Sequence, residues 1–282
     1  MRVGYGLFAL LVCAVMELGA ADATAGEQRM FGRRNPFTVA TLPDGRLRRS
    51  MEELSPAVRA RALKWLHNFN FPATDTTNTL RVDSQGSVLY VDPAPTNGAA
   101  PAATVAAAST ATPVAIALTD IFRLNSRPGA PRTLYLDFDG HQITGTVWNS
   151  AYGGGLPYQA QPYSIDADFL NFSNAERQNI INIWRRVAED FAAFNVNVTT
   201  QAPASMTEFV GRAVITRDTD ANGRAMPHAG AGGVAYVGVF GYAYYGYYSP
   251  ALVYSNRLGG GREDYVAEAA SHELGHNLGL SH

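Results

Sequence analysis

The sequence predicts an α+β domain in its second half, built as a mixed sheet covered by helices. Three observations carry this prediction: a buried-strand pattern in Thr133 to Phe138, a long amphipathic helix after Ser173, and short strands followed by a helix from Asp264 to Leu278. Strands, a helix, more strands and a last helix form the order expected when helices pack on one sheet. We expect a single domain of ordinary size here, because 282 residues leave room for a leader and little else.

The N-terminal stretch MRVGYGLFALLVCAVMELGAADATAG has the layout of a secretory signal peptide. Arg2 is its positive region, Leu7 to Val15 its apolar core, and the small residues up to Ala25 offer cleavage sites. The apolar run is much shorter than the roughly 20 residues that span a bilayer. We therefore expect removal of residues 1–25, an extracellular or periplasmic location, and no stable membrane insertion afterwards. A short buried helix is the alternative interpretation.

A leader unit follows at residues 26–92. Its segment SPAVRARALKWLHNF predicts a helix with Ser55 as its cap and Pro56 in its first turn, and Ser87 to Asp92 predict a strand. Residues 93–125 contain a stretch of Pro, Ala, Thr and Ser with few large side chains to bury, which predicts a linker before a domain at 126–282. This is the layout of a propeptide clipped from an exported enzyme, a zymogen, although a fixed accessory domain would look the same.

In the second domain, Thr133 to Phe138 are rich in β-branched, aromatic and apolar residues, as in a buried strand. The next helix has Ser173 as its cap and Glu176 as the capping-box partner. Its apolar face is formed by Ile180, Ile183, Trp184, Val187, Phe191 and Phe194. NVNVTT, RAVITR, GVAYVGVF and ALVYSN then predict four short strands, separated by turn residues.

The last eleven residues, HELGHNLGLSH, contain three histidines at fixed spacing. His272 and His276 lie four residues apart in a predicted helix, so their side chains project from one face and can bind one ion. Gly279 can adopt the left-handed conformation that ends a helix, and this turn could bring His282 to the same ion. Three imidazoles and one open position are the ligand set of a catalytic zinc ion. Glu273 would lie toward the open position, where it could act as the general base on zinc-activated water.

The composition limits the kinds of metal ligand and of binding partner that the chain can have. The only cysteine, Cys13, lies in the predicted signal, so any metal in the mature chain must be held by histidine and carboxylate. A net charge of −2, without a basic block, predicts no nucleic-acid partner. The five fixed positions of the histidine motif should coincide by chance about once in 10⁵ chains of this length.

These residues resemble the metzincin zinc endopeptidases, whose signature HExxHxxGxxH is matched at every fixed position. The segments LYLDFDGH and VAEDFAAFNVNVTT further resemble the exported bacterial reprolysin-like metallopeptidases. The resemblance covers roughly Arg132 to His282. It implies an upper subdomain with a twisted mixed five-stranded sheet, a backing helix and an active-site helix. It also implies that Gly232 to Phe240 form the edge strand that pairs with a protein or peptide substrate.

The sequence departs from this family in two ways. Metzincins continue after the third histidine into a lower subdomain with a methionine turn, and the sequence ends at His282. We therefore expect either a fragment of a longer reading frame, with the lower subdomain absent from it, or an inactive truncated protease. The leader also has no cysteine to bind the metal, so latency would depend on another ligand or on steric cover.

Two interpretations of function stay open. One is a secreted zinc endopeptidase; the other is a non-catalytic zinc-binding or adhesion module. A second metal, calcium, is a weaker alternative: Asp218 to Gly223 begin like a calcium loop, but Ala229 stands where the twelfth-position carboxylate belongs, so a polar turn between strands is the preferred interpretation. His141 and His228 flank turns, either as outer-shell residues of the site or as loop histidines.

Overall fold

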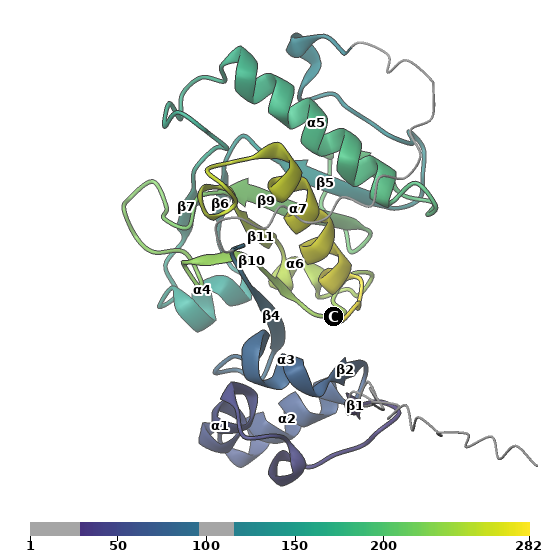
Figure 1. Cartoon of the computed structure of the whole chain (residues 1–282), viewed down its shortest axis with the longest axis vertical. Helices are drawn as coiled ribbons and strands as arrows, with labels where there is room; N and C mark the ends of the chain where they lie inside the picture. Colours follow the sequence, from purple (N-terminus) through teal and green to yellow (C-terminus); the bar gives the residue numbers. More distant parts are fainter. Residues whose placement is uncertain (1–28, 96–115) are drawn as a thin grey trace, which may run out of the picture.

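The computed structural model describes residues 29–95 and 116–282. The predicted signal peptide and the middle of the predicted linker lie outside the described residues. Figure 1 shows the described chain as two parts, with the leader unit at one end and the larger sheet-and-helix part, residues 116–282, at the other.

The central feature is a mixed sheet of seven strands, which contains the five strands predicted in the second domain and the strand predicted at Ser87 to Asp92. In order across the sheet these are β3 (Leu80–Val82), β4 (Val88–Pro93), β10 (Ala231–Tyr236), β11 (Ala251–Tyr254), β9 (Val210–Thr216), β5 (Thr133–Asp137) and β8 (Asn197–Thr199). Strands β11, β9, β5 and β8 run parallel, whereas β10 is antiparallel to β11. The predicted mixed sheet is present, and the leader unit adds β3 and β4 to it. The prediction of an edge strand at Gly232 to Phe240 is wrong, because β10 is paired on both sides, with β11 and with β4.

Helices α5 (Asn174–Asp190) and α7 (Glu263–Asn277) cover one face of this sheet (Figure 1). The predicted capping box of α5 is formed, with the Ser173 side chain accepting from the Glu176 amide. Between helices and sheet lies an apolar core that includes Ile180, Ile183, Val187, Leu134, Ile215, Val266 and Leu274. Phe194 was expected on the apolar face but is 58% exposed, because α5 ends before it.

The opposite face is covered by short elements. These are α4 (Val147–Tyr152), α6 (Tyr245–Tyr248) and the hairpin of β6 (His141–Ile143) with β7 (Tyr158–Ala160). The core on this side includes the large aromatic side chains of Trp148, Tyr158, Tyr236, Tyr245 and Tyr254.

The leader unit folds around a core of its own. It contains β1 (Met30–Gly32), α1 (Arg46–Glu53), α2 (Pro56–Leu66), β2 (Asn70–Pro72) and α3 (Ala73–Asn78), with a three-residue 3₁₀ helix at Val39–Thr41. The second part of the chain contains two further 3₁₀ helices, at Leu118–Asp120 and Ser255–Arg257. Ser55 is the residue before α2, but its side chain makes no capping hydrogen bond. Ser55 is therefore at the predicted N-cap position but makes no capping bond, and Pro56 begins the helix as predicted.

The described ends of the predicted linker are partly packed. Ile121 and Leu124 are buried in the core beneath α5, so the packed part of the second domain begins before residue 126. Both are large apolar side chains, a kind that is usually buried, but they lie at the end of a segment that was predicted to be a linker from its average composition. In the described parts of the chain, no helix has the length and apolar character needed to cross a membrane.

Candidate metal centre

Helix α7 carries two of the three motif histidines. His276 is buried, with 2% of its side chain exposed, whereas His272 one turn earlier is 40% exposed at the cleft. Their ring centroids are 4.5 Å apart, as expected for positions i and i+4 on one helix face. The Nδ1 atom of His276 lies 2.9 Å from the Leu280 carbonyl oxygen, which fixes the ring and leaves Nε2 directed to the centre.

A glycine turn brings the third histidine back to the helix. Gly279 has a φ of +97°, and its amide donates to the His276 carbonyl while the Leu280 amide donates to the Gly275 carbonyl. These two bonds form a Schellman motif, which closes the helix and reverses the chain. As a result His282 Nε2 lies 3.1 Å from His272 Nε2.

The donor atoms fit a metal ion. One nitrogen from each of His272, His276 and His282 and one oxygen of Asp92 lie within 4.8 Å of one another. We call these four residues the metal cluster. Three imidazoles, which bind a metal ion in their neutral form, and one carboxylate match the ligand chemistry of zinc.

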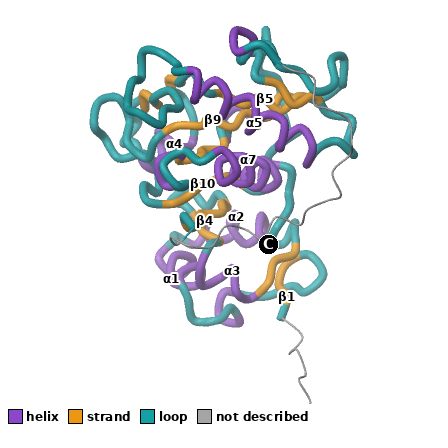
Figure 2. Tube along the Cα trace, turned by 45° about the horizontal axis from the view of Figure 1, so that its top comes forward, coloured by secondary structure: helices purple, strands orange, loops and turns teal. Residues whose placement is uncertain are grey.

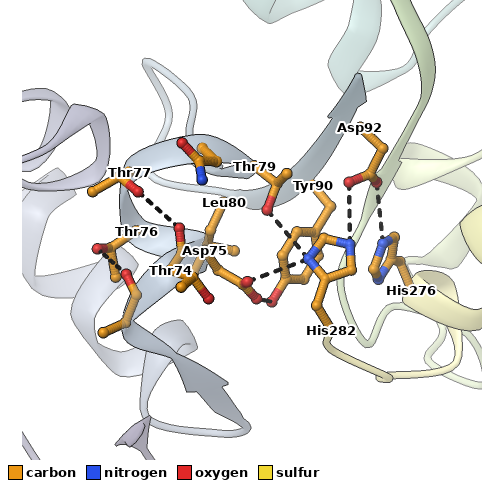
Figure 3. Close-up of polar contacts among 12 residues, drawn as sticks. Thr74, Asp75, Thr76, Thr77, Thr79, Leu80, Tyr90, Asp92, His276 and His282 are labelled. Carbon is orange, nitrogen blue, oxygen red and sulfur yellow. Dashed lines mark hydrogen bonds and ion pairs between the residues drawn. The ribbon is translucent and has the colours of Figure 1, made fainter. Parts of the chain in front are cut away.

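The fourth member, Asp92, comes from leader strand β4 and was not predicted. Its Oδ2 lies 3.2 Å from His276 Nε2 and 3.5 Å from His272 Nε2, and its Oδ1 lies 3.1 Å from His282 Nε2. Figure 3 shows the carboxylate between the rings of His276 and His282. Burial raises the pKa of Asp92, but hydrogen bonds from the three imidazoles outweigh burial and hold the pKa below its usual value.

The leader also holds the outer nitrogen of His282. His282 Nδ1 lies 3.3 Å from Asp75 Oδ1 and 3.2 Å from Thr79 Oγ1, so Nε2 is left to face the metal cluster (Figure 3). The hydroxyl of Tyr90 donates to Asp75 at 2.6 Å, and its ring stacks on His276 at 4.2 Å. Hydrogen bonds to Asp75 and then to Asp92 raise the pKa of His282 to about 9.

Glu273 lies beside the cluster and faces strand β10. It is 1% exposed, and its Oε2 is buried without a hydrogen-bond partner. Burial, followed by the charge of Asp92, raises its pKa well above the usual value. A Cβ atom on Gly233 would approach the Glu273 carboxyl carbon to 2.6 Å, so only glycine leaves room for this side chain.

The metal cluster opens into a cleft of about 390 Å³. The cleft is lined by His272, Glu273 and His282, and also by Asp92 of the leader and Pro93, the last residue of β4. This is the place where a ligand could reach the cluster and the Glu273 carboxylate together.

The other candidate site residues from the sequence, the segment Asp218 to Gly223 and the histidines His141 and His228, lie outside the metal cluster. The side chain of Asp218 accepts from Asn256 and from Arg257 at 2.6 Å, and Asp220 accepts from amides of its own loop. These contacts are those of an ordered turn, and calcium stays a prediction. His141 contacts Arg212, and His228 packs edge-on against Tyr152, and neither belongs to the metal cluster.

The sheet, the active-site helix and the histidine cluster are consistent with the upper subdomain of a metzincin-type metallopeptidase. Comparison with known families gives the same class: the model of the family described as Metallo-peptidase family M12B Reprolysin-like matches residues 185–282. No curated protein and no solved structure matches the chain. The matched residues include the three histidines and Glu273, whereas Asp75 and Asp92 of the leader lie outside the match.

Proposed function

We propose that the protein is an exported zinc-dependent endopeptidase, made as a zymogen, with His272, His276 and His282 as metal ligands. The observation that carries this proposal is the convergence of the three imidazoles beside the buried Glu273 carboxyl, at the mouth of a cleft. The similarity of residues 185–282 to reprolysin-like metallopeptidases supports proteins or peptides as substrates. Export is supported only by the signal-like N-terminal stretch.

Within this proposal, strand β10 orients the substrate. An extended peptide that pairs with β10 would pass Gly233, which lies directly against Glu273. A bound zinc ion would polarise the scissile carbonyl and lower the pKa of the attacking water. Glu273 takes the proton from that water and then delivers it to the leaving amine. The buried position of Glu273 keeps bulk water from competing for this proton.

The test is the Glu273→Gln variant, which keeps the shape of the side chain and removes its basicity. We expect zinc content to stay at that of wild type while hydrolysis of an unfolded protein substrate by the activated protein falls at least 100-fold. Wild-type hydrolysis should also stop on addition of a chelator and return with zinc. Wild-type turnover by Glu273→Gln would contradict the proposed mechanism, and metal binding without any hydrolysis by the wild type would favour a non-catalytic module.

As a matched control we suggest Glu268→Gln. Glu268 lies on the same helix and lines the same cleft, but it is not a member of the metal cluster. Its substitution should change the rate of hydrolysis far less than Glu273→Gln does.

A further inference from the structure

We propose that the leader unit completes the metal site, with Asp92 as the fourth ligand, and that strand β4 holds Asp92 there by occupying the substrate edge of β10. This inference rests on the proposed function and concerns the chain's own residues. It predicts that the intact chain contains a closed site of three histidines and one aspartate, whereas release of the leader leaves an open site of three histidines.

The first step concerns the edge of β10. One edge of β10 pairs with β11, with Gly233 opposite Val253. The other edge pairs with β4, which places Asp92 opposite Gly233 and Tyr90 opposite Ala235. Both edges are therefore occupied, and a peptide can pair with β10 only after β4 has left.

The second step concerns the geometry of Asp92. A carboxylate that merely neutralises one imidazole would contact one ring, but Asp92 approaches all three, at 3.1 to 3.5 Å. It reaches them from the strand opposite Gly233, the glycine against which Glu273 lies. Asp92 thus stands where the fourth ligand of a tetrahedral zinc site belongs, which is the position that a catalytic site leaves open.

The third step concerns docking of the leader. The indole Nε1 of Trp65 donates to the Val237 carbonyl at 3.0 Å, and the Tyr236 hydroxyl donates to Asp83 at 2.9 Å. Leu89 of β4 is fully buried among side chains of the opposite part. These contacts together fix the register that places Asp92 at the cluster.

The leader also contains a positioning residue, Asp75, which acts through His282. Asp75 is 4% exposed, and it contacts the outer nitrogen of His282 while accepting from Tyr90. A carboxylate on the far nitrogen of a ligating histidine fixes the ring and increases its affinity for metal. The leader thus both blocks the metal cluster and strengthens its hold on the ion.

The experiment uses the intact chain loaded with Co²⁺ in place of zinc, because the visible spectrum of Co²⁺ reports its ligands. Acetohydroxamate is the probe, since it binds the metal only where a coordination position can be freed. We expect the wild-type spectrum to be insensitive to the probe, and the spectrum of Asp92→Ala to differ at the outset and to change when the probe is added. Asp92→Asn keeps the shape of the side chain and should also admit the probe, which covers the case in which Asp92→Ala fails to fold.

Metal affinity provides the second readout. Competition with a chelator should show Asp75→Asn to bind Co²⁺ about 10- to 100-fold more weakly than wild type, with the Asp92-dependent spectrum retained. Asp44→Asn is the matched control, because the Asp44 side chain is 92% exposed and pairs with Arg48 of the leader.

The outcomes separate the two proposals. A wild-type chain that binds Co²⁺ and responds to the probe as readily as Asp92→Ala overturns the fourth-ligand assignment and leaves the proposed hydrolysis standing. Equal affinities for Asp75→Asn and Asp44→Asn overturn the positioning role. Absence of Co²⁺ binding in every variant, the wild type included, would overturn the proposed function itself.

Discussion

Two regions of the molecule surround the metal cluster, and they hold their side chains by different means. On α7 and its terminal turn, His272, His276 and His282 are placed by helix geometry and by one left-handed glycine, all within eleven residues. The leader places Asp92 through strand pairing with β10, across 184 positions of sequence from His276. The proposed ligand set of the helix is therefore a local property, whereas the proposed closure of the site depends on a docked unit and can be lost without it. In Figure 2, β4 lies between β10 and the leader helices α1 and α3.

The largest expected effect comes from removing a ligand on the helix side. His276→Ala deletes the most buried of the three imidazoles and leaves the metal with two histidines and Asp92. We expect metal affinity to fall by more than about 100-fold, since even outer-shell partners of ligands are worth 10- to 100-fold. The measurement is bound zinc after dialysis against a weak chelator.

His67→Ala serves as the control, because His67 contacts Phe37 inside the leader and lies outside the cluster. The comparison between regions also predicts that Asp92→Ala retains bound zinc where His276→Ala does not. Equal retention of zinc by Asp92→Ala and His276→Ala would contradict the proposed difference between the histidines, which hold the ion, and Asp92, which closes the site.

An intermediate effect is expected from Gly233→Ala, which acts on Glu273 without touching a ligand. The new methyl group would collide with the Glu273 carboxyl group and displace it. Misplacement of a catalytic group by about 1 Å can cost 100-fold in rate, so the activated protein should lose about that much in kcat while keeping its zinc.

Gly246→Ala is the matched control, since a Cβ at Gly246 meets nothing within 4 Å. A wild-type kcat in Gly233→Ala would show that the Glu273 side chain can adopt another active position. Loss of zinc would show that β10 also supports the metal ligands.

The two regions also differ in how far the sequence predicts them. The strand patterns, the capping box of α5 and the approach of the three histidines follow from local periodicity and from one glycine, so they could be predicted. Asp92 ends an ordinary strand pattern and Asp75 lies in a short polar helix, and neither has a spacing that indicates a metal. Their roles arise from the pairing of β4 with β10, and pairing between distant strands has no local signature.

The smallest expected effect concerns docking alone. Trp65 of the leader and Trp184 of α5 make the same contact: each indole donates to a backbone carbonyl, of Val237 at 3.0 Å and of Val198 at 2.9 Å. Replacement of either by Phe removes one hydrogen bond worth about 1 kcal/mol, together with some packing. Only the first of these bonds joins the leader to the sheet-and-helix part.

Trp65→Phe should therefore raise the population with β4 undocked about fivefold, because 1 kcal/mol changes an equilibrium by that factor. Hydrogen exchange of the Val237 amide measures this population, since that amide donates to the Val88 carbonyl of β4 at 3.0 Å. Trp184→Phe should instead speed exchange near β8 and leave Val237 unchanged. Equal acceleration at Val237 in both variants would mean that leader and sheet open as one unit, in which case undocking of β4 could not expose the metal cluster separately from unfolding.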